Sequence, residues 1–177
     1  YDENFQICHG VVSSLHEIPR LRQSKYAQSR IGSTFTQVRS LLKQGHTVLF
    51  CGTPCQSAGL QRLLGNEYKN LYCCDFICRG VISPKVYVKF LKDMQPAEDT
   101  KLSLVHFKNK DFGWNQFSTK LSFADGSMYH KKRNEDYYMR GYLNHNLYIR
   151  PSCHQCQYKT LPRTSDISLG DFWGIGK

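Results

Sequence analysis

Hydrophobic positions in the first hundred residues alternate between helical and strand-like spacing. Apolar side chains recur every three to four residues in the ranges 33–45, 54–64 and 84–93, which predicts three amphipathic helices. Between these ranges lie two short, mostly apolar runs, 46–51 and 71–77, that are typical of buried strands. The order helix–strand–helix–strand–helix predicts a parallel sheet with helical crossovers.

The pattern changes after residue 100. Short alternating runs replace the long amphipathic segments, and Asp125-Gly126 is a hairpin turn signal. We therefore expect an α/β protein whose mainly parallel sheet is flanked by helices, with an antiparallel α+β extension in the second half. In this half the predicted strands are 102–107, 117–123, a strand beginning at Met128 and a last one at 166–169, with a short helix at 134–143.

Cys55 lies where the first predicted strand gives way to a helix. Thr53 is a good N-cap, Pro54 suits the first helical position, and Gln56 completes a Thr-x-x-Gln capping box. Cys55 then falls in the first helical turn, where backbone N–H groups and the positive end of the helix dipole stabilise an anion. This placement favours a thiolate that acts as a nucleophile, a redox thiol or a metal ligand.

The eight cysteines form two groups. With no secretory signal pattern we expect a reducing, cytoplasmic environment and no disulfides. One group lies inside or beside apolar strand-like runs, where cysteine usually acts as an inert small hydrophobe: Cys8, Cys51, Cys73 and Cys74. The other group lies at loop or turn positions: Cys55, Cys78, Cys153 and Cys156.

The two isolated members of the second group follow the ends of the first two predicted strands. If these strands are neighbours in a parallel sheet, Cys55 and Cys78 lie at the same edge, where such sheets bind ligands. Cys153-x-x-Cys156 occurs in zinc sites, in thioredoxin-like motifs and in iron–sulfur sites. One such pair with two isolated cysteines best suits an iron–sulfur cluster, but zinc, a redox thiol and no site at all stay open.

Charge and composition narrow the function only a little. The chain has 24 Lys and Arg against 14 Asp and Glu, a formal charge of +10, but the basic residues are scattered. We do not expect nucleic-acid binding, because a phosphate-bearing cofactor or a solvated basic face explains the charge equally well. No apolar run approaches the roughly 18 residues of a membrane span. A P-loop, a GxGxxG motif and a Ser/His/Asp constellation are all absent from the sequence.

Two smaller features have alternative interpretations. His154, between the two cysteines of the pair, is expected to be a solvent-facing loop residue rather than a ligand. Asp171-Phe172-Trp173 is either a buried turn or a flavin contact. The chain also begins without Met at Tyr1 and has no polar tail, so we expect a segment of a longer protein.

Six motifs in the same order resemble the coenzyme F-420 hydrogenase/dehydrogenase beta-subunit family. On this resemblance, residues 1–30 are the tail end of the family's N-terminal domain and residues 31–177 are its C-terminal domain. Together the motifs span about 150 residues and are SKYAQS (24–29), VLFCGTPCQSAGL (48–60), DFICRGVISPKV (75–86), FKNKDFGW (107–114), RPSCHQCQYK (150–159) and SDISLGDFWG (165–174).

The resemblance implies an oxidoreductase that contains iron–sulfur and flavin groups. Electrons would pass between a [4Fe-4S] cluster, a flavin such as FAD and a two-electron acceptor, either deazaflavin F-420 or an unknown small molecule. The implied partner is a redox protein such as ferredoxin or a hydrogenase/dehydrogenase subunit. The implied cluster ligands are Cys55, Cys78, Cys153 and Cys156, and the implied flavin contacts are Lys25, Tyr26, Ser29, Gly52, Thr53 and Gln56.

One position departs from the family pattern. The family commonly has His after the second cysteine, where this chain has Arg79. A fixed cation there is expected to raise the potential of a nearby cluster. A non-catalytic alternative also remains, in which the chain is an electron-relay subunit without flavin or a zinc-stabilised binding module.

Overall fold

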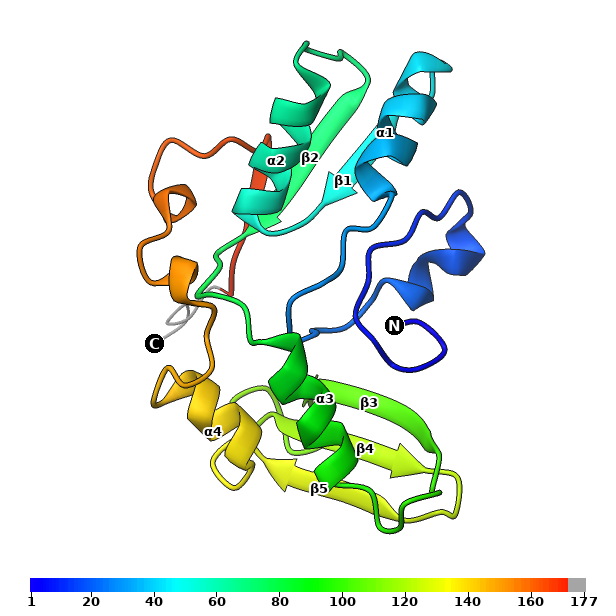
Figure 1. The fold of residues 1–177 in the computed structure, drawn as a ribbon, viewed down its shortest axis with the longest axis vertical. Helices are drawn as coiled ribbons and strands as arrows, with labels where there is room; N and C mark the ends of the chain where they lie inside the picture. The colour runs from blue at the N-terminus through cyan, green and yellow to red at the C-terminus, as the bar shows by residue number, and fades with distance from the viewer. Residues whose placement is uncertain (172–177) are drawn as a thin grey trace. The chain divides into compact units, whose positions relative to one another are not determined.

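The computed structural model describes residues 1–171, and the chain in it forms two compact units (Figure 1). The first unit combines residues 1–30 with 80–151, and the second combines residues 31–79 with the chain from Ser152 onward. The predicted boundary between family domains at residue 31 stays a prediction. In the described part of the chain, no helix is long and apolar enough to cross a membrane.

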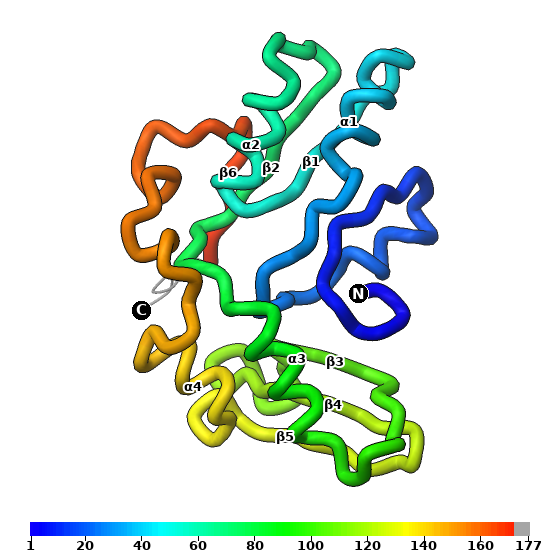
Figure 2. Tube along the Cα trace, in the orientation of Figure 1, coloured from blue at the N-terminus to red at the C-terminus, as the bar shows by residue number. Residues whose placement is uncertain are grey.

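A three-stranded parallel sheet forms the centre of the second unit. Its strands are β1 (Val48–Cys51), β2 (Leu71–Phe76) and β6 (Ile167–Leu169), with β2 in the middle (Figure 2). In register, Val48 pairs with Leu71, and Cys74 pairs with Ile167. The parallel pairing of β1 with β2 confirms the prediction, so the segments that follow these two strands start from the same edge of the sheet.

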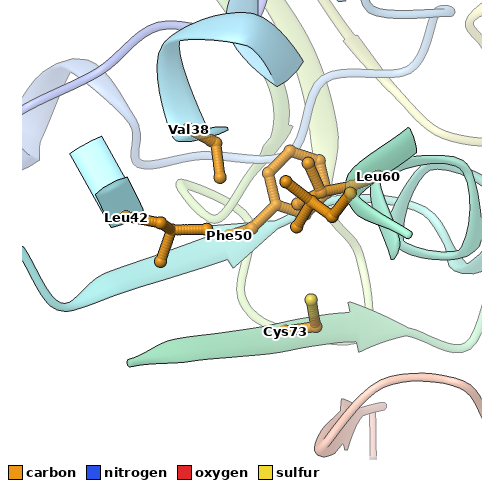
Figure 3. Packing of buried hydrophobic residues seen from close by; sticks show 6 residues of the cluster. Val38, Leu42, Phe50, Leu60 and Cys73 are labelled. Atoms are coloured by element: carbon orange, nitrogen blue, oxygen red, sulfur yellow. The ribbon is translucent and has the colours of Figure 1, made fainter. Parts of the chain in front are cut away.

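Two helices pack on one face of this sheet, α1 (Thr34–Lys43) and α2 (Pro54–Leu64). Val38 and Leu42 of α1 meet Phe50 of β1, and Leu60 of α2 is fully buried against them (Figure 3). Alternation along a strand directs every second side chain to this face. The cluster of buried residues is Val38, Leu42, Phe50, Leu60, Leu64 and Cys73.

Helix α2 begins and ends as its sequence predicts. The N–H of Thr53 donates to the side-chain oxygen of Gln56 at 2.9 Å, which is one half of the capping box, and Pro54 occupies the first turn. Gly65 ends the helix in the left-handed region with φ 70°. Because glycine has no Cβ, it adopts this conformation at little cost.

An antiparallel sheet forms the first unit, with strand order β3 (Leu102–Asn109), β4 (Ser118–Phe123), β5 (Met128–Lys132). This matches the expected extension. Helix α4 (Tyr137–Leu143) and the short 3-10 helix η1 (Leu15–Arg20) also belong to this unit.

Helix α3 (Pro84–Asp93) has the predicted limits but not the predicted surroundings. The chain order placed it beside the parallel sheet, whereas it belongs to the antiparallel unit. Its aromatic side chains explain this, because Tyr87 and Phe90 pack on Phe107 of β3, and Phe90 stacks on Tyr138 at 4.6 Å between ring centroids. Aromatic pairs of this kind contribute beyond their buried area.

A buried carboxylate begins α4. Asp136 is fully buried and accepts hydrogen bonds from the Thr119 hydroxyl, from the Tyr129 hydroxyl at 3.2 Å and from the Tyr138 N–H at 3.0 Å. Burial nevertheless raises the pKa of Asp136, because desolvation outweighs these hydrogen bonds. The folded chain therefore keeps this proton to higher pH than the unfolded chain does.

Truncation of Leu60 tests the core of the second unit. Leu60→Ala removes a side chain with 0% exposure from a packed cluster, so it should lower the free energy of unfolding by about 2–5 kcal/mol. Leu63 lies on the same helix with 44% of its surface exposed, so Leu63→Ala is the matched control and should cost about 0.5 kcal/mol or less. Urea unfolding measures both, and equal losses in the two variants would contradict this packing.

The raised pKa of Asp136 predicts a pH-dependent stability difference. Between the ordinary carboxyl pKa of 3.8 and the raised pKa of Asp136, the native state binds more protons than the unfolded state. The contribution of Asp136 to the free energy of unfolding therefore falls as pH rises through this window, and it is constant at higher pH. The stability of the protein minus that of Asp136→Asn, which keeps an acceptor at the cap, should therefore decrease as pH rises through this window. Urea unfolding at a series of pH values measures the difference.

Asp125 supplies a control of opposite sign. Hydrogen bonds from the Ser127 hydroxyl and N–H hold the pKa of Asp125 below its usual range. The corresponding difference for Asp125→Asn should shrink as pH falls rather than as it rises. A difference for Asp136→Asn that grew with pH would refute the account of the buried carboxylate.

Candidate functional site

Cys55 lies in the first turn of α2 with its side chain exposed. The Thr53 hydroxyl oxygen is 3.2 Å from the Cys55 sulfur. A hydroxyl at this distance can donate to a thiolate, and the start of the helix adds the positive end of its dipole. The local structure of β1 and α2 therefore places a thiol at the carboxyl edge of the parallel sheet.

Cys78 lies two residues beyond β2 and is half-buried. The N–H of Ile77, just before it, donates to the Leu169 carbonyl at 2.8 Å, which extends the pairing of β2 with β6. Since β1 and β2 are parallel neighbours, the loops that carry Cys55 and Cys78 start from one edge of the sheet. The predicted common edge is thus confirmed for the backbone.

The Cys153-x-x-Cys156 pair lies between two short 3-10 helices. Cys153 ends η2 (Pro151–Cys153), Cys156 precedes η3 (Gln157–Lys159), and both thiols are half-buried. The helix η3 contacts α2, which also carries Cys55. All four candidate ligands therefore belong to the second unit and lie on segments next to α2 or β2.

Lys159 joins two of these segments, a role that the sequence did not indicate. Its ammonium group donates to the Arg79 carbonyl at 2.6 Å and to the Cys153 carbonyl at 2.7 Å. The loop after β2 is thereby tied to the loop of the cysteine pair. Only the position of this lysine, three residues after Cys156, could have drawn attention to it.

The chain that follows the cysteine pair is fixed to β2 and α2. The Gln61 side chain donates to the Thr164 carbonyl at 2.7 Å, and the N–H of Cys73 donates to the Asp166 carboxylate at 2.7 Å. The Ser168 hydroxyl donates to the buried carboxylate of Asp75 at 2.5 Å. These contacts are long-range in sequence, and they hold the far end of the segment that carries Cys153 and Cys156.

The four candidate cysteines have the chemistry that an iron–sulfur cluster requires, but they do not form a metal-binding group in this structure. None of the eight cysteines forms a disulfide, so all four candidate thiols are available in the required chemical form. Within residues 1–171, however, no three His, Cys, Asp or Glu side chains lie together so as to hold a metal. Cluster binding therefore requires the thiols to converge, and it would couple to the ordering of these loops.

The candidate flavin residues of the first unit are engaged with their own unit. The Lys25 ammonium donates to three carbonyls of the preceding turn, the shortest being Arg22 at 2.6 Å, and burial lowers the pKa of Lys25. The Tyr26 carbonyl accepts from the Tyr138 hydroxyl at 2.6 Å, and the Ser29 hydroxyl lies 2.8 Å from a ring nitrogen of His9. Their assignment to a flavin stays a prediction.

The candidate flavin residues of the second unit form the turn from β1 into α2. The Gly52 N–H donates to the Cys74 carbonyl at 3.1 Å, and the Thr53 N–H is held by Gln56. A Cβ at Gly52 would come within 2.9 Å of the Phe50 ring, so the turn has no room for a larger residue. Both N–H groups already have partners, so a phosphate bound here would have to replace these bonds.

Two of the remaining candidate residues are exposed. They are His154, as expected for a loop histidine, and Asp171. Phe172 and Trp173 lie outside the described residues. Cys51 differs from the prediction of an inert strand cysteine, because its side chain is exposed, while Cys73 is buried as expected.

Comparisons with known proteins agree with this architecture. A sequence profile for the C terminus of the beta subunit of coenzyme F420 hydrogenase/dehydrogenase matches residues 45–177. No curated protein matches.

The fold is also similar to that of a chain in a solved structure. That structure is a xenon derivative of the F420-reducing [NiFe] hydrogenase complex from Methanosarcina barkeri, with a TM-score of 0.56 and 15% sequence identity. The alignment covers 97% of this chain and 55% of that chain, so this chain spans about half the length of its structural neighbour. At this identity the likeness shows a shared fold.

The profile match covers most of the chain and includes the parallel sheet and all four candidate cysteine ligands. The family's description names beta subunits of hydrogenases and dehydrogenases. This chain belongs to the family formed by the C-terminal region of coenzyme F420 hydrogenase/dehydrogenase beta subunits.

Proposed function

We propose that this chain is the electron-transfer part of an iron–sulfur flavoprotein oxidoreductase. The observation that carries the proposal is that Cys55, Cys78, Cys153 and Cys156 all belong to one compact unit, with Cys55 and Cys78 on segments that leave the carboxyl edge of its parallel sheet. Two thiols on separate loops and a Cys-x-x-Cys pair on a third segment supply the number and type of ligands that a [4Fe-4S] cluster requires. Membership of a hydrogenase and dehydrogenase family supports the redox assignment.

The residues of the chain have separate roles in this proposal. Cys55 and Cys78 supply thiolates from the sheet edge, and Cys153 and Cys156 supply them from the loop that Lys159 ties to Arg79. The Thr53 hydroxyl, 3.2 Å from the Cys55 sulfur, donates to that sulfur and adjusts the electron density at the site. When bound, the cluster supplies one-electron transfer and a flavin converts it to two-electron chemistry.

The acceptor and partners belong to the same proposal. The acceptor is deazaflavin F-420 or another small two-electron acceptor, and the flavin is FAD, with contacts at the turn of Gly52, Thr53 and Gln56. The formal charge of +10 favours an acidic redox partner such as ferredoxin or a hydrogenase subunit. A cytoplasmic location stays an expectation from the sequence.

Metal and flavin analysis of protein purified without oxygen tests the proposal. The unaltered chain should contain about four iron atoms and four acid-labile sulfides, together with flavin. Replacing any one of the four ligands with Ala should remove most of the iron, because a cluster with three protein ligands is exposed to oxidation and loss. Cys8→Ala lies in the other unit and should keep full iron.

Two results would overturn the assignment. A Cys55→Ala or Cys78→Ala protein that retained its full cluster would show that the ligands are elsewhere. Zinc in place of iron, bound by the same four cysteines, would instead support the zinc-stabilised binding module. Iron and sulfide without flavin would restrict the chain to an electron relay.

Lys159 gives a second test that does not depend on activity. Lys159→Met removes two hydrogen bonds from the ammonium group, each worth about 0.5–1.5 kcal/mol at most in this exposed position. We expect amide exchange in residues 150–163 to accelerate by roughly three- to tenfold. Bound iron should also be lost faster in the presence of a chelator.

The matched control for this substitution is Lys69→Met, in the turn before β2. It should leave both exchange in residues 150–163 and the rate of iron loss unchanged. If Lys159→Met behaved like this control, Lys159 would not hold the two loops together.

A further inference from the structure

The parallel sheet has a second face that the core helices do not cover. Phe50 and Cys73 point toward α1 and α2, so alternation turns the neighbouring side chains of β1 and β2 the other way. On that side Leu49 is 61% exposed and Tyr72 is 50% exposed. Cys51 and Cys74 lie on this same face, Cys51 exposed and Cys74 half-buried.

Cys51 and Cys74 are partners in the parallel register of β1 and β2. Strands in a sheet are about 4.8 Å apart, and register partners direct their side chains to the same face. The N–H of Gly52 donates to the Cys74 carbonyl at 3.1 Å, which fixes the register at this end of the strands. The backbone therefore holds the two thiols side by side on one surface.

The titration behaviour of Cys51 agrees with this geometry. The pKa of the Cys51 thiol is raised first by partial burial, and then by the charge of Cys74 and by a hydrogen bond to it. The influence of Cys74 on this pKa agrees with two thiols that lie on the same face of the sheet. Neither residue belongs to the set of four proposed cluster ligands, and each is four residues before one of them in the sequence.

We propose that Cys51 and Cys74 form a two-thiol binding site for a soft, thiophilic ion or metalloid that accepts only two protein ligands. Thiolate sulfur selects soft ions such as monovalent copper over harder ones. Such ions need no third protein ligand, and none of the described residues completes a group of three here. Arsenic(III), a trivalent metalloid that binds two thiols, also needs no third protein ligand, so the site takes one such atom.

Phenylarsine oxide is the probe, because it distinguishes a thiol pair from single thiols. Two As–S bonds form, the arsenic-bound oxygen leaves as water with both thiol protons, and arsenic stays trivalent. No oxidant or reductant is consumed. Each sulfur raises the effective concentration of the other, so the pair should bind at least roughly tenfold more tightly than either thiol alone.

The experiment titrates the whole chain, purified without oxygen, with phenylarsine oxide and follows bound arsenic by intact mass. The strand spacing also falls within the range of about 4.4–6.8 Å that disulfides accept, so reduced thiols are counted before each titration. We expect Cys51→Ser and Cys74→Ser each to lose one tight equivalent that the unaltered chain and Cys8→Ser both bind, while any equivalent held by the Cys153-x-x-Cys156 pair stays unchanged.

Iron content measured in the same samples separates this site from the proposed cluster site. If Cys51→Ser and Cys74→Ser lose arsenic binding while their iron content is unchanged, the inference is supported, whether or not the proposed function is correct. Two results overturn it: the same number of tight equivalents in both serine variants as in the unaltered chain, and loss of iron together with arsenic binding in Cys51→Ser. The second result would place Cys51 in the cluster site itself.

Discussion

Parallel pairing of β1 with β2 is the constraint on which the candidate site depends. Because both strands run in the same direction, the turn into α2 and the loop after β2 leave from one edge. An antiparallel pairing would have sent Cys55 and Cys78 to opposite ends of the sheet. The pairing is held by a small core in which Phe50, Leu60 and Cys73 meet, so the site depends on apolar packing on one face of the sheet.

The position of the Cys153-x-x-Cys156 pair depends on contacts between distant parts of the chain. β6 joins the sheet beside β2, and Asp166 and Thr164 bind Cys73 and Gln61, about a hundred residues earlier. Lys159 then closes the loop between them onto the carbonyl of Arg79. The main chain of Arg79, the residue after Cys78, is therefore part of the framework of the site.

Sequence patterns predicted the local features and the parallel pairing of β1 with β2, but missed other long-range contacts. The capping box and Gly65 fixed both ends of α2, because each acts through contacts within one helical turn. Helix α3 has the predicted limits but other neighbours than expected, since its place depends on aromatic packing such as that of Phe90 on Tyr138 and of Tyr87 on Phe107. The role of Lys159 could not be predicted from the sequence. Its hydrogen-bond partners are main-chain carbonyl groups, which every residue has.

The exposure of Cys51 shows that a sequence does not reveal which face of a strand is covered. The short apolar run between two helices predicts a buried strand, in which a cysteine usually acts as an inert small hydrophobe. The helices instead cover only the face of Phe50, so strand alternation leaves Cys51 exposed opposite Cys74. Period-two alternation was readable from the sequence, but which face is covered depends on the tertiary structure.

The most direct test of the central claim is the electron paramagnetic resonance spectrum of the chain, purified without oxygen and reduced with dithionite. The account predicts a signal from a reduced [4Fe-4S] cluster that integrates to about one spin per chain and is lost when Cys55 or Cys153 is replaced. A reduced sample that gives no such signal while its four cysteines hold zinc would contradict the account.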